Sequence, residues 1–317
     1  MGQQLSRCWP WLFMALGLWL VTVQVQAQAA LAQSAAAPHV GASGLAAANG
    51  ATQPSAGLPI APGTIPCARP LYLTFDTGHM GVADLIADVL RRQQVRATFF
   101  AAHEPTQVGD GSLGEHWAPW WRERAAEGHA FASHTYDHTY WKADLPGGRF
   151  RVRASAGPDK NKTRDWGADQ YCQEITRARD RLQAITGKPP LPLFRAPGGK
   201  TSPALLSAAR ACGFAHVGWA PAGFLGDELS SQTHPNAQLL QTALANIRSG
   251  DILMAHLGIW SRQDPWAPAV LEPLIVGLKQ KGFCFVTLRE HPQFAAHVRQ
   301  AAEGRASTTL ARASGVP

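Results

Sequence analysis

The feature that most constrains the fold is an alternation of short strand-like runs with helix-like segments. The strand-like runs are short and largely apolar, and they occupy residues 71–76, 96–101, 130–134, 191–196, 214–220, 251–256 and 283–288. Apolar residues at helical spacing mark the segments 82–90, 117–126, 175–185, 203–211, 239–247 and 271–278. This alternation favours a parallel sheet, and no glycine-rich dinucleotide fingerprint follows the first run. We therefore predict an α/β fold, an incomplete barrel of about seven βα units in a single catalytic domain.

Composition divides the chain into four parts. Residues 1–29 have one early charge, an apolar core and small residues near the end, which is typical of a signal peptide. An uncleaved membrane anchor is the alternative. Residues 30–66 are an Ala/Gly/Pro linker that we expect to be disordered, because they hold almost no large apolar residue. The catalytic domain is predicted at 67–297, followed by a polar C-terminal tail at 298–317 that we expect to fray. The signal pattern predicts a periplasmic or secreted protein.

Cysteines and charge limit the choice of partner. Cys67, Cys172, Cys212 and Cys284 remain after the predicted signal, so one or two disulfides are expected, with the pairing left open. The net charge of +7 is spread thinly, and with the export signal it argues against nucleic-acid binding. We expect a polysaccharide partner and no stable membrane insertion after signal cleavage. The oligomeric state is left open.

Chemically capable side chains stand at the carboxyl ends of several predicted strands. Barrel enzymes build their active sites from these ends. The residues at these positions are Asp76, His134 with His138, Arg195, Trp219 and His256. A carboxylate, histidines and an arginine at one mouth are suited to metal-assisted or general acid–base hydrolysis. The simpler alternative for Asp76 alone is a turn or helix-capping carboxylate.

His134 and His138 are four residues apart. On a helical turn this spacing would place both imidazoles on one face, where they could share a metal ion. A pair of structural or surface histidines is the alternative for an isolated motif of this kind. Its place at a strand end favours the metal-binding interpretation.

Four short motifs carry a resemblance to a known family. Residues 74–78 (TFDTG), 133–138 (SHTYDH), 194–199 (FRAPGG) and 253–256 (LMAH) resemble, in order and spacing, the motifs of the polysaccharide deacetylases. This is the NodB homology group, also called carbohydrate esterase family 4. The resemblance covers about residues 69–291 and implies a distorted (β/α)7 barrel that hydrolyses N-acetyl amide bonds of carbohydrates.

The resemblance also implies a role for each matching residue. Asp76 matches the catalytic base, Arg195 the arginine that orients it, and His256 the general acid. His134 and His138 match the metal-binding pair. The implied cofactor is a divalent metal, with zinc preferred.

The chain departs from the family pattern at three places. The usual second Asp of the first motif, the third metal ligand, is replaced by Thr77, so weaker metal binding is expected and Thr77, Asp76 or His79 remain alternatives for that ligand. Met254 replaces the usual Leu. The carboxylate expected shortly after Trp219 is missing, and Asp227 is the nearest substitute for a charge relay, expected to pair with Arg195.

The polar, irregular stretch 139–167 is too long for an ordinary connection and is therefore a candidate binding loop. Several residues near the motifs are also candidates for substrate contact. They are Tyr136, Pro197, Gly198, Trp219, Met254 and Trp260. The backbone N–H of Tyr136 is expected to stabilise the oxyanion. Tryptophans offer stacking surfaces for sugar rings, although for Trp219 core packing is the favoured interpretation. We predict an exported, metal-assisted hydrolase that removes N-acetyl groups from amino sugars of a cell-envelope or extracellular polysaccharide. The alternatives are a metal-independent or other C–N hydrolase on the same fold, or a glycan-binding pseudo-enzyme.

Overall fold

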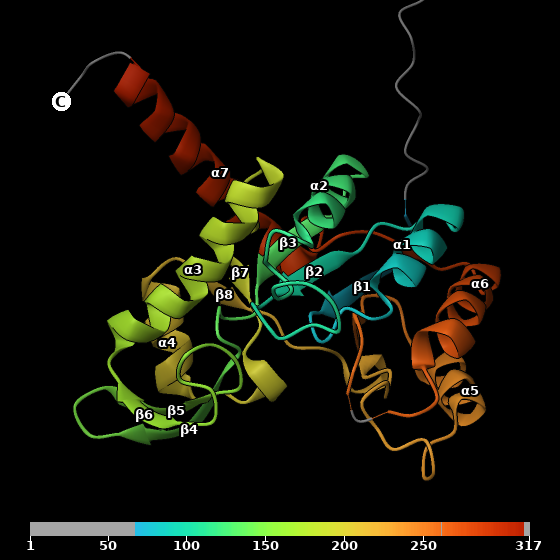
Figure 1. Cartoon of the computed structure of the whole chain (residues 1–317). Helices are drawn as coiled ribbons and strands as arrows, with labels where there is room; N and C mark the ends of the chain where they lie inside the picture. The colour runs from blue at the N-terminus through green and yellow to red at the C-terminus, as the bar shows by residue number, and fades with distance from the viewer. Residues whose placement is uncertain (1–66, 261, 314–317) are drawn as a thin grey trace, which may run out of the picture. The chain divides into compact units, whose positions relative to one another are not determined.

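The computed structural model describes residues 67–260 and 262–313. The predicted signal peptide and linker therefore lie outside the described residues. Seven parallel strands form the central sheet (Figure 1), and each coincides with one of the predicted runs. The strands are β1 (Pro70–Asp76), β2 (Thr98–Ala101), β3 (Ala130–Ser133), β7 (Leu193–Phe194), β8 (Ala215–His216), β9 (Ile252–His256) and β10 (Cys284–Phe285).

The sheet is a distorted (β/α)7 barrel, as predicted. Its strand order is β10-β1-β2-β3-β7-β8, and β9 also pairs with β1. Among the described strands β8 and β9 are not paired with each other. The short helix Pro221–Gly223 and its neighbours fill this place, where Ala220 N–H donates to the Ile252 carbonyl and Leu225 N–H to the Met254 carbonyl.

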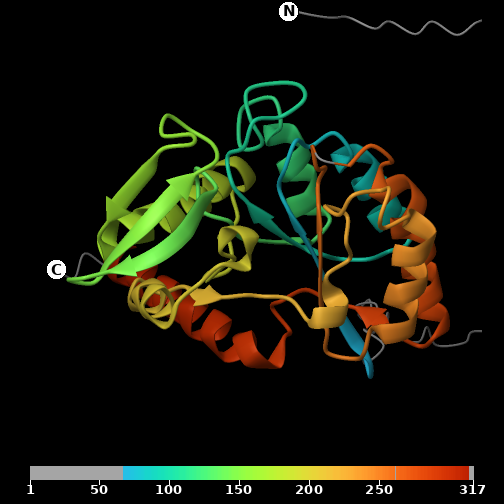
Figure 2. The ribbon, with the colours of Figure 1, turned by 90° about the horizontal axis from the view of Figure 1, so that it is seen from below.

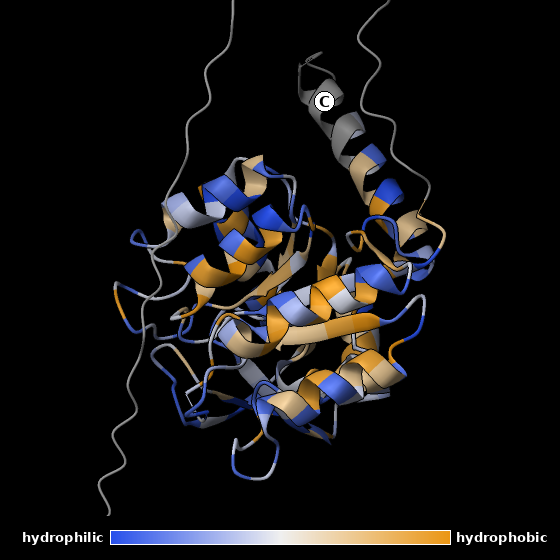
Figure 3. Cartoon of the chain, turned by 90° about the vertical axis from the view of Figure 1, so that its right-hand side faces the viewer, coloured by the Kyte–Doolittle hydropathy of each residue, from blue (hydrophilic) through white to orange (hydrophobic). Residues whose placement is uncertain are grey.

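Helices connect the strands and cover the outside of the sheet, and their polar and apolar residues alternate along each ribbon (Figure 3). They are α1 (Ala83–Arg92), α2 (Ala118–Ala126), α3 (Ala168–Thr186), α4 (Pro203–Ala211), α5 (Asn236–Asn246), α6 (Glu272–Gln280) and α7 (Pro292–Ala313), with short turns at Pro197–Gly199 and Ala267–Leu271. The six helices predicted between the strands all form, with ends shifted by a few residues.

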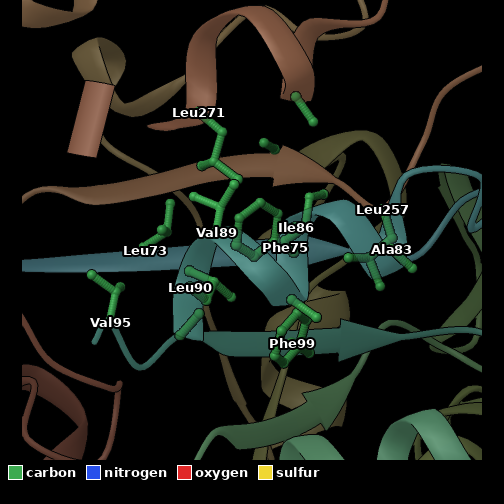
Figure 4. Close-up of a cluster of buried hydrophobic side chains, with 14 of the residues drawn as sticks. Leu73, Phe75, Ala83, Ile86, Val89, Leu90, Val95, Phe99, Leu257 and Leu271 are labelled. Atoms are coloured by element: carbon green, nitrogen blue, oxygen red, sulfur yellow. The ribbon is translucent and has the colours of Figure 1, made fainter. Parts of the chain in front are cut away.

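The main core lies between the sheet and the α1 side of the barrel. Leu73 and Phe75 of β1 meet Ile86 and Val89 of α1 (Figure 4), and all four side chains are almost fully buried. The intervening positions of β1 face the other way, so Thr74 and Asp76 point into the barrel, where Arg195 bonds both of them. The two-residue period of a strand therefore separates packing residues from chemical residues.

The segment 139–167, expected to be an irregular loop, is instead ordered. It forms a three-stranded antiparallel sheet of β4 (Thr139–Leu145), β5 (Arg149–Ala154) and β6 (Thr163–Trp166). The burial of β5 alternates strictly, which is the pattern of a sheet with one covered face. The expectation was wrong because polar residues on the open face hide this alternation. Figure 2 shows the small sheet on one side of the barrel, opposite α1, α5 and α6.

The expected frayed tail differs as well, because residues 298–313 continue helix α7. Repeated alanines give this polar segment high helix propensity. The four described cysteines form two disulfides, Cys67–Cys284 and Cys172–Cys212, and the prediction was one or two. Within the described part of the chain, the helices all fall short of the length and apolarity needed to cross a membrane.

Candidate active site

A cavity of about 600 Å³, here called the central cavity, lies at the carboxyl ends of the barrel strands. Its lining includes most of the residues predicted from strand ends: Asp76, Thr77, His134, His138, Gly198, Trp219, Met254, His256 and Trp260. Arg195 lies directly behind this lining and bonds Asp76. Segments far apart in the sequence are therefore brought to one place by the parallel strands.

Asp76 is held between charged and polar partners at the end of β1. Arg195 Nη1 donates to Asp76 Oδ1 at 2.7 Å and to Thr74 Oγ1 at 2.9 Å, and the arginine side chain has no exposed surface. Two backbone carbonyls accept from the same guanidinium, those of Val217 and Gly218. Burial alone would raise the pKa of Asp76, but Arg195 and the nearby histidines outweigh it and lower the pKa. Asp76 is therefore an ionised carboxylate with one fixed oxygen and one facing the cavity.

His256 stands beside Asp76, since the two residues are register partners on β9 and β1. Both oxygens of Asp227 lie 3.1 Å from His256 Nδ1, and Asp227 Oδ2 also accepts from the His256 backbone N–H at 2.7 Å. Burial alone would lower the pKa of His256, but Asp227 raises it to about 9. The imidazole is therefore protonated at neutral pH and can donate a proton.

The expected pairing of Asp227 with Arg195 is wrong. The turn after Pro221–Gly223 brings Asp227 against β9, where it bonds His256, while Arg195 takes Asp76 as its carboxylate. The charge relay thus acts on the acid and not on the base. The number of residues between Asp227 and the arginine motif does not predict whether Asp227 bonds Arg195 or His256.

His134 and His138 have ring centroids 4.8 Å apart. Their turn is not the helical turn that the spacing suggested: Thr135 and His138 have positive φ values of 60° and 48°. The strained conformation is held by hydrogen bonds, including Thr139 N–H to Thr135 Oγ1 and Asp137 N–H to Glu174 Oε2, both at 2.8 Å. The tight turn brings both imidazoles to the central cavity.

Each imidazole of this pair has one nitrogen engaged by the protein. His134 Nδ1 lies 2.9 Å from the Arg195 carbonyl oxygen, and His138 Nδ1 lies 2.5 Å from Ser155 Oγ. Burial lowers the pKa of His134 to about 4, so its imidazole is neutral. Its Nε2 lies 3.5 Å from Asp76 Oδ2. A neutral imidazole fixed through Nδ1 is the form in which histidine binds a metal.

Two of the three alternatives for the third metal ligand are weakened by the structure. The Thr77 hydroxyl donates to Glu104 Oε2 at 2.5 Å and accepts from Ala102 N–H at 3.0 Å, so its proton and one of its two lone pairs are already engaged. His79 accepts from Gly81 N–H and packs against Trp260. It lines a neighbouring cavity of about 300 Å³ and not the central cavity.

Glu104 is a site residue that the sequence reasoning missed. It follows β2, its side chain is 17% exposed, and it lines the central cavity next to Thr77 and His138. Burial would raise its pKa, but His138 and the Thr77 hydrogen bond outweigh this and lower the pKa. Its position shortly after the carboxyl end of β2 is the signal in the sequence that points to it.

The chemistry of these donors fits a divalent cation. Neutral imidazoles and ionised carboxylates around one cavity are the ligand types that zinc uses in hydrolytic sites. Among the described residues, however, no group of three or more His, Cys, Asp or Glu side chains is arranged to hold an ion as it stands. Ligation would therefore require side-chain adjustment within the cavity.

The candidate substrate residues divide into two groups. Gly198, Trp219, Met254 and Trp260 line the central cavity, and Pro197 is buried immediately before Gly198. Tyr136 does not reach the cavity lining. The proposed use of its backbone N–H for an oxyanion is wrong, because that group donates to the Glu174 carbonyl at 3.0 Å and the ring packs on Arg177.

The small sheet contributes residues that the sequence reasoning did not single out. Tyr140 of β4 and Lys160 of the loop between β5 and β6 line the central cavity. A Cβ on Gly198 would lie 3.0 Å from the Tyr140 ring, so glycine lets the two walls approach closely. Part of the segment expected to bind substrate therefore does form a wall of the cavity.

Comparisons of the sequence with known proteins identify what this chain is similar to. The sequence profile described as polysaccharide deacetylase matches residues 65–217. A chitooligosaccharide deacetylase from Azorhizobium caulinodans is 25% identical over 228 residues, which cover 69% of this chain and 92% of the relative.

Solved structures show the same fold. A family 4 acetyl xylan esterase from Clostridium thermocellum, in complex with a cobalt ion, has a TM-score of 0.54 at 21% identity, covering 72% of this chain and 91% of that one. A peptidoglycan N-acetylglucosamine deacetylase has a TM-score of 0.51 at 23% identity, covering 71% and 88%.

Proposed function

We propose that this chain, which matches the polysaccharide deacetylase family over residues 65–217, removes N-acetyl groups from amino sugars of a cell-envelope or extracellular polysaccharide. One observation carries the proposal. Asp76 and His256 face each other from paired strands at one cavity, and each has its own charged partner. A carboxylate kept ionised beside an imidazole kept protonated is the pairing that amide hydrolysis requires.

The proposed reaction needs one proton acceptor and one proton donor. Asp76 takes a proton from the attacking water, whose oxygen forms a bond with the acetyl carbonyl carbon. His256 gives its proton to the sugar nitrogen as the carbon–nitrogen bond breaks, so that acetate and a free amine leave. Arg195 and Asp227 keep the two groups in the required charge states. These four residues act in two pairs, one for each proton transfer.

His134 and His138 are the residues that would hold the divalent cation, and we propose zinc. The ion would supply Lewis acidity, which polarises the acetyl carbonyl and makes water easier to deprotonate. The hydrogen bonds from His134 Nδ1 and His138 Nδ1 to protein oxygens orient both rings for this role.

We place the acetyl methyl against Met254, which is almost fully buried in the lining of the central cavity. Trp260 is 65% exposed at the same cavity and is suited to stacking on a sugar ring. The two disulfides are typical of an oxidising compartment and support the proposed periplasmic or secreted location.

The test is acetate release from a panel of N-acetylated glycans by the purified protein, with and without a chelator. We expect acetate and a matching number of free amines from at least one polymer, and a large loss of both with chelator. Activity unchanged by thorough metal removal would favour the metal-independent hydrolase. Binding of a glycan without any acetate release across the panel would favour the pseudo-enzyme and overturn the proposal.

A further inference from the structure

Glu104 is a carboxylate that is 17% exposed and has no cation at hydrogen-bond distance among the described residues. Among the described residues, its one ion-pair contact is the long one to His138 Nδ1, at 3.9 Å. The same carboxylate accepts the Thr77 hydroxyl, which is neutral. An ionised carboxylate in a buried place costs free energy unless a cation compensates it. Within residues 67–260 and 262–313, the central cavity therefore carries a carboxylate whose one ion-pair contact is long.

The backbone around Glu104 is fixed in place. Glu104 N–H donates to Ser112 Oγ at 2.9 Å, and Ser112 N–H donates back to the Glu104 carbonyl at 3.0 Å. Ser112 Oγ in turn donates to the Ala102 carbonyl at 2.6 Å. These hydrogen bonds hold the loop after β2 in one conformation. The Glu104 side chain is therefore directed into the central cavity.

Strand register explains why Glu104 meets Thr77. Asp76 of β1 pairs with Phe100 of β2, and Ala102 N–H bonds the Thr77 hydroxyl. The Glu104 carboxylate thus lies against the side chain at position 77, where the family usually has its second Asp. Thr77 has no charge of its own at this position. Its hydroxyl instead positions the Glu104 carboxylate.

We infer that Glu104 supplies the third protein ligand of the metal, in place of the residue at position 77. The inference rests on the proposed metal-assisted function and concerns only which residue carries the charge. Thr77 is then a positioning residue, since its hydroxyl holds Glu104 Oε2. The ligand set would be two imidazoles and one carboxylate, which is a common set for hydrolytic zinc.

The experiment measures zinc binding by calorimetry to metal-stripped proteins, without substrate. The variants are Glu104→Gln, Thr77→Asp and the double variant Thr77→Asp/Glu104→Gln. Glutamine keeps the size of Glu104 and an oxygen for the Thr77 hydrogen bond, so it removes the charge alone. Glu115→Gln is the control, because Glu115 lies on the same stretch after β2 with a side chain that is 76% exposed.

We expect Glu104→Gln to weaken zinc binding by at least roughly tenfold, the scale of changes in a metal's ligand environment. The double variant should recover most of this loss, because it returns a carboxylate to position 77. Glu115→Gln should bind as the parent does. Melting curves of the metal-free proteins check that each variant is folded.

Two results would overturn the inference while leaving the proposed hydrolase intact. One is parent-like zinc binding by Glu104→Gln; the other is a double variant that binds no better than Glu104→Gln. If the folded parent itself binds no zinc yet releases acetate, the metal mechanism fails together with this ligand. If the parent binds zinc through Glu104 but releases no acetate, only the proposed activity fails.

Discussion

The two sides of the central cavity differ in how completely the protein has prepared them. On the acid–base side, Arg195 bonds Asp76 and Asp227 bonds His256, so each charge has an opposite charge at hydrogen-bond distance. On the side of the proposed metal site, the partners of Glu104 among the described residues are a hydroxyl and a distant imidazole. The charges of the acid–base side are therefore compensated within the protein, whereas on our proposal the second side is complete with a cation.

The largest expected effect is on the acid–base side. Asp76→Asn removes the proton acceptor and should lower kcat by roughly a thousandfold, within the range for loss of a general base. Zinc affinity, measured in parallel, should change by less than about tenfold. A variant that keeps kcat within tenfold of the parent would show that Asp76 is not the base. A variant that loses zinc as strongly as activity would show that the two sides are not separate.

The acid can be tested through pH. His256 has a raised pKa of about 9, so it should stay protonated, and active, until the pH rises through about 9. Asp227→Asn removes the main cause of the increase, and the alkaline limb of kcat/KM should move down toward the ordinary histidine value near 6.5. At pH 8.5 the loss should be roughly 10- to 100-fold, and it should shrink at lower pH. An unchanged alkaline limb in the Asp227→Asn profile would contradict this assignment.

The sequence predicted residues at strand ends better than residues in the loops beyond them, for a physical reason. Asp76, His134 and His256 end buried strands, and parallel strands bring such ends together whatever the loops do. Glu104 and Asp227 lie beyond their strands, and their partners depend on loop conformation and strand register. Neither is visible in the local pattern, so Glu104 was missed and Asp227 was given the wrong partner.

The elements of the fold also differ in how well the sequence predicts them. The seven parallel strands are predictable from runs of apolar residues because both faces of each strand are covered. The small sheet β4–β6 has one open polar face, so its residues looked like a loop. Helix α7 was missed because high alanine content, and not an apolar stripe, is what its sequence offers.

A smaller effect is expected from metal on stability. Zinc at about a hundred times its Kd should stabilise the folded protein by about 2.7 kcal/mol, which raises Tm by about 5–10 °C in a domain of this size. His134→Ala should abolish this increase, whereas Asp227→Asn should retain it. A metal-dependent Tm increase that survives in His134→Ala would place the ion elsewhere.

The smallest effect on activity is expected at the exposed edge of the central cavity, where Trp260 lies. Trp260→Ala removes an exposed stacking surface and should raise KM about 3- to 10-fold with little change in kcat, since it acts before the proton transfers. Val108→Ala is a matched control, because Val108 is also a large exposed apolar residue but lines neither the central cavity nor its neighbour. A comparable fall in kcat for Trp260→Ala would mean that this edge orients the reacting group as well.

The pairing of β1 with β9 has a consequence for how the enzyme comes into being. Asp76 lies on the first barrel strand to leave the ribosome, and its register partner His256 lies on one of the last. A nascent chain that has emerged as far as α5 already contains the base, both imidazoles and Glu104, but it has no acid. Because this long-range pairing must wait for nearly complete translation, catalytic competence arrives late and in one step.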